Sequence, residues 1–198
     1  LEALESIPRH YDIARAAGID VPPIFEIILP MTTSAIEIRR IISYYKKFVV
    51  GKSSSTLFEG DSLKISDWIG DFLPESINVI PLVENSESLI HADKIAGEII
   101  EKEKPDHLRI FLARSDPALN YGSAAAVIYN KIALSKLWML SEQKSVPIYP
   151  IIGVGSAPFR GNLKPNNVKN CLKGYPSVQT FTIQSSFKYD YPQAQVRE

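Results

Sequence analysis

Five short apolar segments alternate with stretches of helical periodicity, and this alternation constrains the fold more than any other feature of the sequence. The first segment is rich in Ile and too short for a typical helix, as expected of a buried strand, and the other four are equally short. The predicted strands are residues 23–30, 77–83, 108–113, 146–152 and 178–183. Helical segments are expected in the four intervals between them. Strict alternation of strands and helices predicts an α/β fold with a parallel sheet whose faces are covered by helices.

Two kinds of parallel α/β fold compete for this pattern. No GxGxxG motif follows the first predicted strand and no P-loop occurs, so the nucleotide-binding doubly wound folds lose support. A (β/α)8 TIM-type barrel fits better, but such a barrel has eight strands and about 250 residues. The 198 residues supply about five of these strands. We therefore predict a single domain over residues 1–198 that forms a partial barrel, and expect a longer functional polypeptide.

The composition excludes several classes of partner. The 22 basic and 22 acidic residues give a net charge of zero, so there is no electrostatic footprint for nucleic acid or for an anionic membrane. No apolar run approaches the roughly 20 residues that span a bilayer. The single cysteine, Cys171, excludes an intramolecular disulfide, suits a cytoplasmic protein, and is expected to pack as a small hydrophobic residue near a helix end.

Polar residues follow each predicted strand. In a parallel barrel the carboxyl ends of the strands converge on one rim, and active sites of such folds lie there. The predicted rim residues are Thr32, Thr33, Ser34, Glu84, Asn85, Arg114, Ser115, Asp116, Asn120, Arg160 in the glycine-rich segment 153–161, Gln184, Ser186 and Lys188. The histidines do not follow strands and are expected to be structural or exposed.

Glu84 and Asp116 follow neighbouring predicted strands. A carboxylate pair beside arginines suits Mg²⁺ or Mn²⁺ shared with an anionic substrate, because Mg²⁺ usually takes one or two protein carboxylates and completes its octahedron with substrate oxygens and water. Arg160 suits bidentate capture of a phosphate or carboxylate. Each residue also has a plainer interpretation: an Asx turn for Asp116, a solvated loop acid for Glu84 and a surface arginine for Arg160. Their joint occurrence at strand ends favours a site.

Several segments together resemble one known family. They are ILPMTTS (28–34), IPLVENSESL (80–89), FLARSDPALNYG (111–122), GVGSAPFRGNLKP (153–165) and TIQSSFKYDYP (182–192). They resemble phosphoenolpyruvate carboxylase, most closely its short archaeal type; the bacterial and plant enzymes show the related patterns PLFET, YSDS, GRGGxxGRGG and FKYGLP. The match runs in order over nearly the whole chain.

The resemblance implies a (β/α)8-type barrel in cytosolic, usually tetrameric enzymes that convert phosphoenolpyruvate and bicarbonate to oxaloacetate and phosphate with Mg²⁺ or Mn²⁺. Glu84 and Asp116 fall on the family's metal ligands, and Arg160 on the second arginine of its glycine-rich loop. Val154 stands where the loop's first arginine would be, and Leu119 where the bacterial pattern has a lysine. The family's histidine motif, an early strand with a substrate arginine and the C-terminal part have no counterpart here.

These observations lead to a specific set of site hypotheses. Arg160 and Arg114 are predicted as catalytic residues, Glu84 and Asp116 as metal ligands, and Arg160, Ser115, Gln184 and Lys188 as substrate-binding residues. The predicted partners are phosphoenolpyruvate and bicarbonate, in a homotetramer. Two alternatives stay open: another metal-dependent lyase or aldolase of the phosphoenolpyruvate/pyruvate barrel group, and a non-catalytic portion of the carboxylase.

Overall fold

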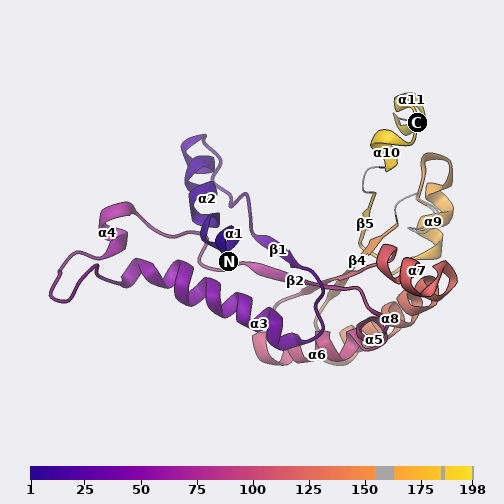
Figure 1. The fold of residues 1–198 in the computed structure, drawn as a ribbon, viewed down its shortest axis with the longest axis horizontal. Helices are drawn as coiled ribbons and strands as arrows, with labels where there is room; N and C mark the ends of the chain where they lie inside the picture. The colour runs from indigo at the N-terminus through magenta and orange to yellow at the C-terminus, as the bar shows by residue number, and fades with distance from the viewer. Residues whose placement is uncertain (155–162, 184–185, 198) are drawn as a thin grey trace. The chain divides into compact units, whose positions relative to one another are not determined.

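The structure is a computed structural model that describes residues 1–154, 163–183 and 186–197 (Figure 1). Five strands form one sheet in the order β1-β2-β3-β4-β5. The strands are β1 (Glu26–Leu29), β2 (Asn78–Val83), β3 (Leu108–Leu112), β4 (Ile148–Gly153) and β5 (Thr180–Thr182). Each lies in one of the five predicted segments, and only β4 runs one residue beyond its segment. The apolar runs were therefore a sufficient signal for the strands.

The strands are parallel. Leu82 of β2 pairs with Phe111 of β3, which in turn pairs with Ile151 of β4, and all three pairings from β2 to β5 are parallel. On the β1 side, the Asn78 N–H donates to the carbonyl of Phe25 at 2.8 Å, and further along both segments the Thr32 N–H donates to Leu82 at 2.9 Å. From the first of these bonds to the second, the residue numbers increase along both segments. The two segments therefore run in the same direction, and β1 is parallel to β2.

The strand order distinguishes the two fold types left by the sequence. A doubly wound sheet reverses its strand order at a switch point. Here every strand is hydrogen-bonded to the next strand in the chain, with no reversal. Neighbours in sequence that are also neighbours in space are the arrangement of a (β/α)8 barrel. The chain supplies five consecutive strands of this type, and the predicted fold class is confirmed.

Helices precede β1, lie in the four intervals between strands and follow β5. Before β2 they are α1 (Glu2–Glu5), α2 (Ile7–Ala16), α3 (Ala35–Tyr44), the π-helix η1 (Tyr45–Val49), the 3-10 helix η2 (Val50–Ser54) and α4 (Ile65–Ile69). After β2 they are α5 (Ser86–Ile90), α6 (Ala92–Glu103), α7 (Ser115–Tyr121), α8 (Ser123–Lys144), the 3-10 helix η3 (Pro165–Asn167), α9 (Val168–Gly174), α10 (Ser186–Tyr189) and α11 (Gln193–Arg197). Helix α8 packs against α5, α6 and α7, and α5, α6 and α8 lie on the same side of the strands (Figure 1). No helix in the described ranges is both long and apolar enough to cross a membrane.

Backbone contacts divide the chain into two compact units. The first comprises Leu1–Ile28 and Ile36–Val79, and the second comprises Leu29–Ala35 and Ile80–Glu198, so the division passes through β1 and β2. Within the first unit Tyr45 is fully buried and its hydroxyl donates to the Pro74 carbonyl at 2.8 Å. Burial raises the pKa of Tyr45 to about 12. That residues 1–198 act as one domain stays a prediction.

Helix α8 is fastened to the end of β3 by a buried amide. Asn130 is fully buried, and its Nδ2 donates to the carbonyl of Ala113 at 3.0 Å and to that of Ala126 at 2.9 Å. Ala113 directly follows β3, so this bond holds the strand exit against the helix. A buried carbonyl needs such a partner, because an unpaired polar group inside a protein is costly.

Two segments differ from the simplest interpretation of their sequence. Pro117 and Gly122 predict a loop after β3, but this prediction is wrong, because residues Ser115–Tyr121 form helix α7. Pro117 is compatible with this helix because it lies in the first turn, where its missing N–H would have no partner in any case. Gly122, with φ of +87°, separates α7 from α8. The serine-rich residues 52–56 likewise predict a loop, but their first part belongs to η2.

The buried amide of Asn130 leads to a test of stability. We expect Asn130→Ala to lower the free energy of unfolding by about 1–3 kcal/mol, because the Ala113 carbonyl loses its partner. Urea unfolding followed by circular dichroism measures the change. The matched control is Asn170→Ala, since Asn170 is exposed and its Nδ2 donates to the Asn167 side chain at 3.0 Å. Equal stability of the two variants would contradict the role assigned to Asn130.

Candidate functional site

A cavity of about 420 Å³ lies where β1, β2 and β3 end, and is here named the rim cavity. It is lined by Met31, Thr33, Glu84, Asn85, Asp116 and Asn120. These residues come from the three segments that directly follow the three strands. The convergence expected of parallel strand ends therefore brings both predicted carboxylates to one cavity.

A second cavity, of about 250 Å³, adjoins the same carboxylates and is here named the inner cavity. Its lining is Leu82, Glu84, Phe111, Ala113, Arg114, Ser115, Asp116 and Gly153. Leu82 of β2 pairs with Phe111 of β3. Two residues further along each segment lie Glu84 and Ala113, which also line this cavity. Because alternate residues of a strand share one face, the inner cavity lies on a single face of the sheet. Glu84 and Asp116 are common to both cavities.

Glu84 is held by the backbone on both sides. It directly follows β2, and the next residue, Asn85, caps helix α5 by accepting a hydrogen bond from the Ser88 N–H at 2.7 Å. The Oε2 atom of Glu84 accepts the N–H of Met31 at 2.8 Å. This bond occupies one of the two carboxylate oxygens, so the group keeps acceptor capacity for a second partner.

Asp116 lies in the first turn of α7 and is exposed. A carboxylate is favourable there because the N-terminal end of a helix carries a partial positive charge. Among the residues that the structure describes, its side chain makes no hydrogen bond, which favours a role other than the Asx turn. Its position in both cavities gives the carboxylate access to a ligand.

The donor set fits a hard divalent cation. Mg²⁺ in proteins usually binds one or two carboxylates and keeps several water or substrate oxygens. Glu84 and Asp116 supply two carboxylates on shared cavities. Among the residues that the structure describes, no group of three or more His, Cys, Asp or Glu side chains could hold a metal, so a closed site made only of protein ligands is not formed there. The pair fits an open Mg²⁺ or Mn²⁺ site, and metal binding itself stays a prediction.

Arg114 has a largely internal environment. Its side chain is 5% exposed, its guanidinium carbon lies 5.7 Å from the centre of the Tyr175 ring, and its buried Nε has no partner in the described ranges. Lys131 Nζ lies 4.4 Å from the centre of the same ring. Such contacts between a cation and an aromatic ring stabilise packing. The structure thus joins Arg114 to Tyr175, and its predicted catalytic role stays untested.

The remaining predicted residues are distributed as follows. Ser115 is half-buried and lines the inner cavity. Lys188, in α10, is exposed and its Nζ lies 5.0 Å from the centre of the Tyr189 ring. It does not line either cavity as these are formed by the described residues. Arg160 and Gln184 lie outside the described residues, as does most of the segment 153–161.

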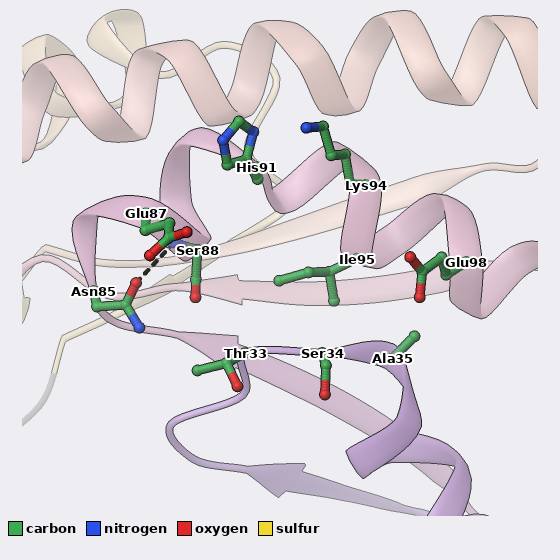
Figure 2. Close-up of a pocket in the computed structure, with 10 residues that line it drawn as sticks. All are labelled: Thr33, Ser34, Ala35, Asn85, Glu87, Ser88, His91, Lys94, Ile95 and Glu98. Carbon is green, nitrogen blue, oxygen red and sulfur yellow. Dashed lines mark hydrogen bonds between the residues drawn. The ribbon is translucent and has the colours of Figure 1, made fainter.

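A further cavity of about 360 Å³ is drawn in Figure 2 and lies between the segment 33–35 and helices α5 and α6. Its lining is Thr33, Ser34, Ala35, Asn85, Glu87, Ser88, His91, Lys94, Ile95 and Glu98. Thr33 and Asn85 also line the rim cavity, so the two spaces are neighbours. Its lining carries both acidic and basic side chains, and it includes neither Glu84 nor Asp116.

Sequence reasoning placed Thr33, Asn85 and Asn120 at the rim but missed Met31. The functional group of Met31 is its main-chain N–H, and every residue except proline has one. The one available signal was its position after Pro30 at the end of a predicted strand, where a turn is expected. Nothing in the side chain indicated that this N–H would reach Glu84.

Comparison with known proteins identifies the chain's relatives. All 198 residues match the family model described as "Phosphoenolpyruvate carboxylase". The chain belongs to the phosphoenolpyruvate carboxylase family. It is 51% identical over 197 residues to the phosphoenolpyruvate carboxylase of Pyrococcus abyssi, covering 99% of this chain and 41% of that protein. The corresponding protein of Methanothermobacter thermautotrophicus is 52% identical over 197 residues, with 99% and 40% covered.

The phosphoenolpyruvate carboxylase of Halobacterium salinarum is 47% identical over 203 residues, covering 100% of this chain and 41% of that protein. The chain thus spans about two fifths of the length of these curated relatives. Among solved structures, the HpcH/HpaI aldolase from Desulfitobacterium hafniense DCB-2 aligns at a TM-score of 0.49 and 10% identity, covering 94% of this chain and 74% of that chain. The resemblance found in the sequence motifs is confirmed by the family match and the relatives.

Cys171 lies near Arg114, and its burial explains why we expect a low reactivity of its thiol. This thiol is buried in α9, as expected of a small hydrophobic residue near a helix end. Burial raises the pKa of Cys171, and the nearby positive charge of Arg114 opposes this only in part. Because a raised pKa reduces the thiolate fraction near neutral pH, the residue is a poor nucleophile.

We expect alkylation of Cys171 by iodoacetamide at pH 8 to be at least about ten-fold slower in the native protein than in urea, since the thiolate is the reacting form. The rate should rise with pH beyond the range in which a free thiol has already levelled off. Mass spectrometry of the peptide that contains Cys171 measures the rate, and N-acetylcysteine is the reference thiol. A native rate equal to that of the reference would contradict the burial and the raised pKa.

Proposed function

We propose that the complete protein carboxylates phosphoenolpyruvate with bicarbonate and forms oxaloacetate and inorganic phosphate. Membership of the phosphoenolpyruvate carboxylase family over the whole chain supports this reaction class. The observation that carries the proposal at the level of residues is the pair Glu84 and Asp116, which come from neighbouring strand ends and line the same two cavities.

The proposed reaction has two stages. An oxygen of bicarbonate forms a bond to phosphorus, and the bond from phosphorus to the enol oxygen breaks, which gives carboxyphosphate and the enolate of pyruvate. Carboxyphosphate then breaks down to carbon dioxide and phosphate. The enolate carbon forms a new carbon–carbon bond to the carbon dioxide, which gives oxaloacetate. A bound Mg²⁺ or Mn²⁺ supplies positive charge where the enolate oxygen becomes negative.

The residues of this chain have separate tasks in the proposal. Glu84 and Asp116 hold the divalent cation, and the Met31 N–H holds one oxygen of Glu84 in place. The Ser115 hydroxyl is available to substrate in the inner cavity. Arg160 is proposed to bind the phosphate or bicarbonate as a planar bidentate donor. Gln184 and Lys188 complete the proposed substrate-binding set, and Arg114 remains the second proposed catalytic residue.

The location, the assembly and the partners of the complete protein are part of the same proposal. A cytoplasmic location is supported by a single, buried cysteine, which is typical of a reducing compartment. Assembly as a homotetramer is proposed on the family resemblance alone, and sedimentation of the complete protein measures it. A net charge of zero supports small anionic substrates rather than nucleic acid as partners.

The reaction itself is tested by two assays on the complete protein. We expect phosphate release from phosphoenolpyruvate that requires both bicarbonate and Mg²⁺ or Mn²⁺, with oxaloacetate formed in equal amount. Retro-aldol cleavage of 2-oxo acids should be absent. Cleavage of a 2-oxo acid without bicarbonate-dependent phosphate release would overturn the carboxylase proposal in favour of a lyase or aldolase.

The metal site is tested by Asp116→Asn, with Asp106→Asn as the matched control. Asp106 and Asp116 are both exposed, but Asp106 precedes β3 whereas Asp116 follows it. Loss of one carboxylate ligand should cost several kcal/mol of charge stabilisation, or about 100-fold or more in kcat. Mn²⁺ binding, measured by electron paramagnetic resonance of the free ion, should weaken in parallel. Turnover of the Asp116 variant equal to that of the Asp106 variant would remove Asp116 from the site.

A further inference from the structure

The turn that follows β1 has an unusual backbone conformation. Residues Leu29, Pro30, Met31 and Thr32 form this turn, and Met31 has φ of +55°. Proline at the second position keeps φ near −65°, and a positive φ at the third position is then characteristic of a type II turn. That third position normally requires Gly or Asn, because other side chains are strained in the left-handed region. Met31 is therefore held in a conformation that its own side chain disfavours.

The conformation has a direct structural consequence. In a type II turn the central peptide is rotated by about half a turn relative to type I, and this rotation re-aims the N–H of the third residue. The re-aimed N–H of Met31 donates to Glu84 Oε2 at 2.8 Å. The strain at Met31 thus accompanies a bond to the carboxylate that shares both cavities with Asp116.

The same turn is pinned to the strand that carries Glu84. Thr32 is 1% exposed, and its N–H donates to the Leu82 carbonyl at 2.9 Å. Its Oγ1 donates to the Leu29 carbonyl at 2.8 Å and closes the turn. Leu82 precedes Glu84 by two residues, so the turn is tied both to the strand and to the carboxylate at the end of that strand.

The side chain of Met31 does not account for the strain. It is 76% exposed, so burial of the side chain offers little compensation. Strained residues persist where the surrounding structure enforces them, and they are concentrated at functional sites. The contacts that enforce Met31 are the bonds of Thr32 and the bond to Glu84.

We propose that the turn Leu29–Thr32 is a positioning device for Glu84 as a metal ligand. Met31, in its left-handed conformation, fixes Oε2 from the main chain and so orients the carboxylate beside Asp116 for a divalent cation. Met31 and Thr32 are positioning residues that act through Glu84. The inference rests on the proposed function, because it takes Glu84 and Asp116 as the cation ligands.

The test uses the complete protein and three substitutions of methionine. Met31→Val strains the left-handed conformation further because valine is β-branched. Met31→Gly permits that conformation without strain and keeps the N–H. Met139→Val is the matched control, since Met139 is 60% exposed on α8. Mn²⁺ affinity is measured by electron paramagnetic resonance, and the midpoint of thermal unfolding is measured alongside.

Partners of metal ligands typically contribute 10- to 100-fold in metal affinity. We therefore expect Met31→Val to weaken Mn²⁺ binding about ten-fold, with Met31→Gly and Met139→Val within about two-fold of the parent protein. A merely structural turn would instead lower the unfolding midpoint of Met31→Val and leave the Mn²⁺ affinity unchanged. That result would overturn the proposal.

A second measurement does not depend on the metal or on the folding of the Met31 variants. In protein labelled with ¹⁵N-methionine, Glu84→Gln should shift the amide proton of Met31, because a neutral amide is a weaker acceptor than a carboxylate. The amide of Met139 should not move. An unmoved Met31 resonance would overturn the inference.

The outcomes also separate this inference from the proposed function. If the parent protein binds no Mn²⁺, or if Asp116→Asn binds it equally well, the proposed metal site fails and this inference fails with it. If the parent protein binds Mn²⁺ and Asp116→Asn does not, but Met31→Val binds it as tightly as the parent, only the role of Met31 is overturned.

Discussion

The parallel register of the strands is the constraint on which the site depends. Leu82, Phe111 and Ile151 lie opposite one another on successive strands, and Ile151 lies opposite Thr180 on β5. Because parallel strands in register end at a common edge, the residues just beyond each strand are brought close together. The register of β2 and β3 therefore brings Glu84 to the cavity of Asp116, and the bond from the Met31 N–H holds one oxygen of its carboxylate. The polar residues of the candidate site lie at this edge.

This arrangement divides the polar side chains into two groups with different physical requirements. Inside, Asn130 Nδ2 donates to two carbonyls and the Arg114 guanidinium contacts the Tyr175 ring, whereas Asn130 Oδ1 and Arg114 Nε have no partner among the described residues. At the rim, Asp116 is exposed, so water can hydrate its carboxylate. Arg114 and Asp116 are only two residues apart, but Arg114 is buried and Asp116 is exposed. This difference in burial explains why one side chain packs against a ring and the other is open to solvent.

The sequence predicts elements whose signal lies in side chains. All five strands were found from apolar runs, and the rim positions of Glu84 and Asp116 followed from counting past those runs. Helix α7 was missed because Pro117 is normally read as a helix breaker, and its tolerance in the first turn depends on where the helix begins. The packing of the Arg114 side chain could not be predicted from the sequence either, because its contact with Tyr175 joins segments 61 residues apart.

Met31 shows why part of a site stays hidden from sequence analysis. Its contribution is a main-chain N–H whose direction depends on one backbone angle, and a methionine gives no indication of a positive φ. A glycine would have signalled the turn and adopted it more easily, because glycine takes a positive φ without strain. It would have supplied the same main-chain N–H to Glu84. The carboxylate is thus oriented by a main-chain group, which substitutions that alter only side-chain polarity would not reveal.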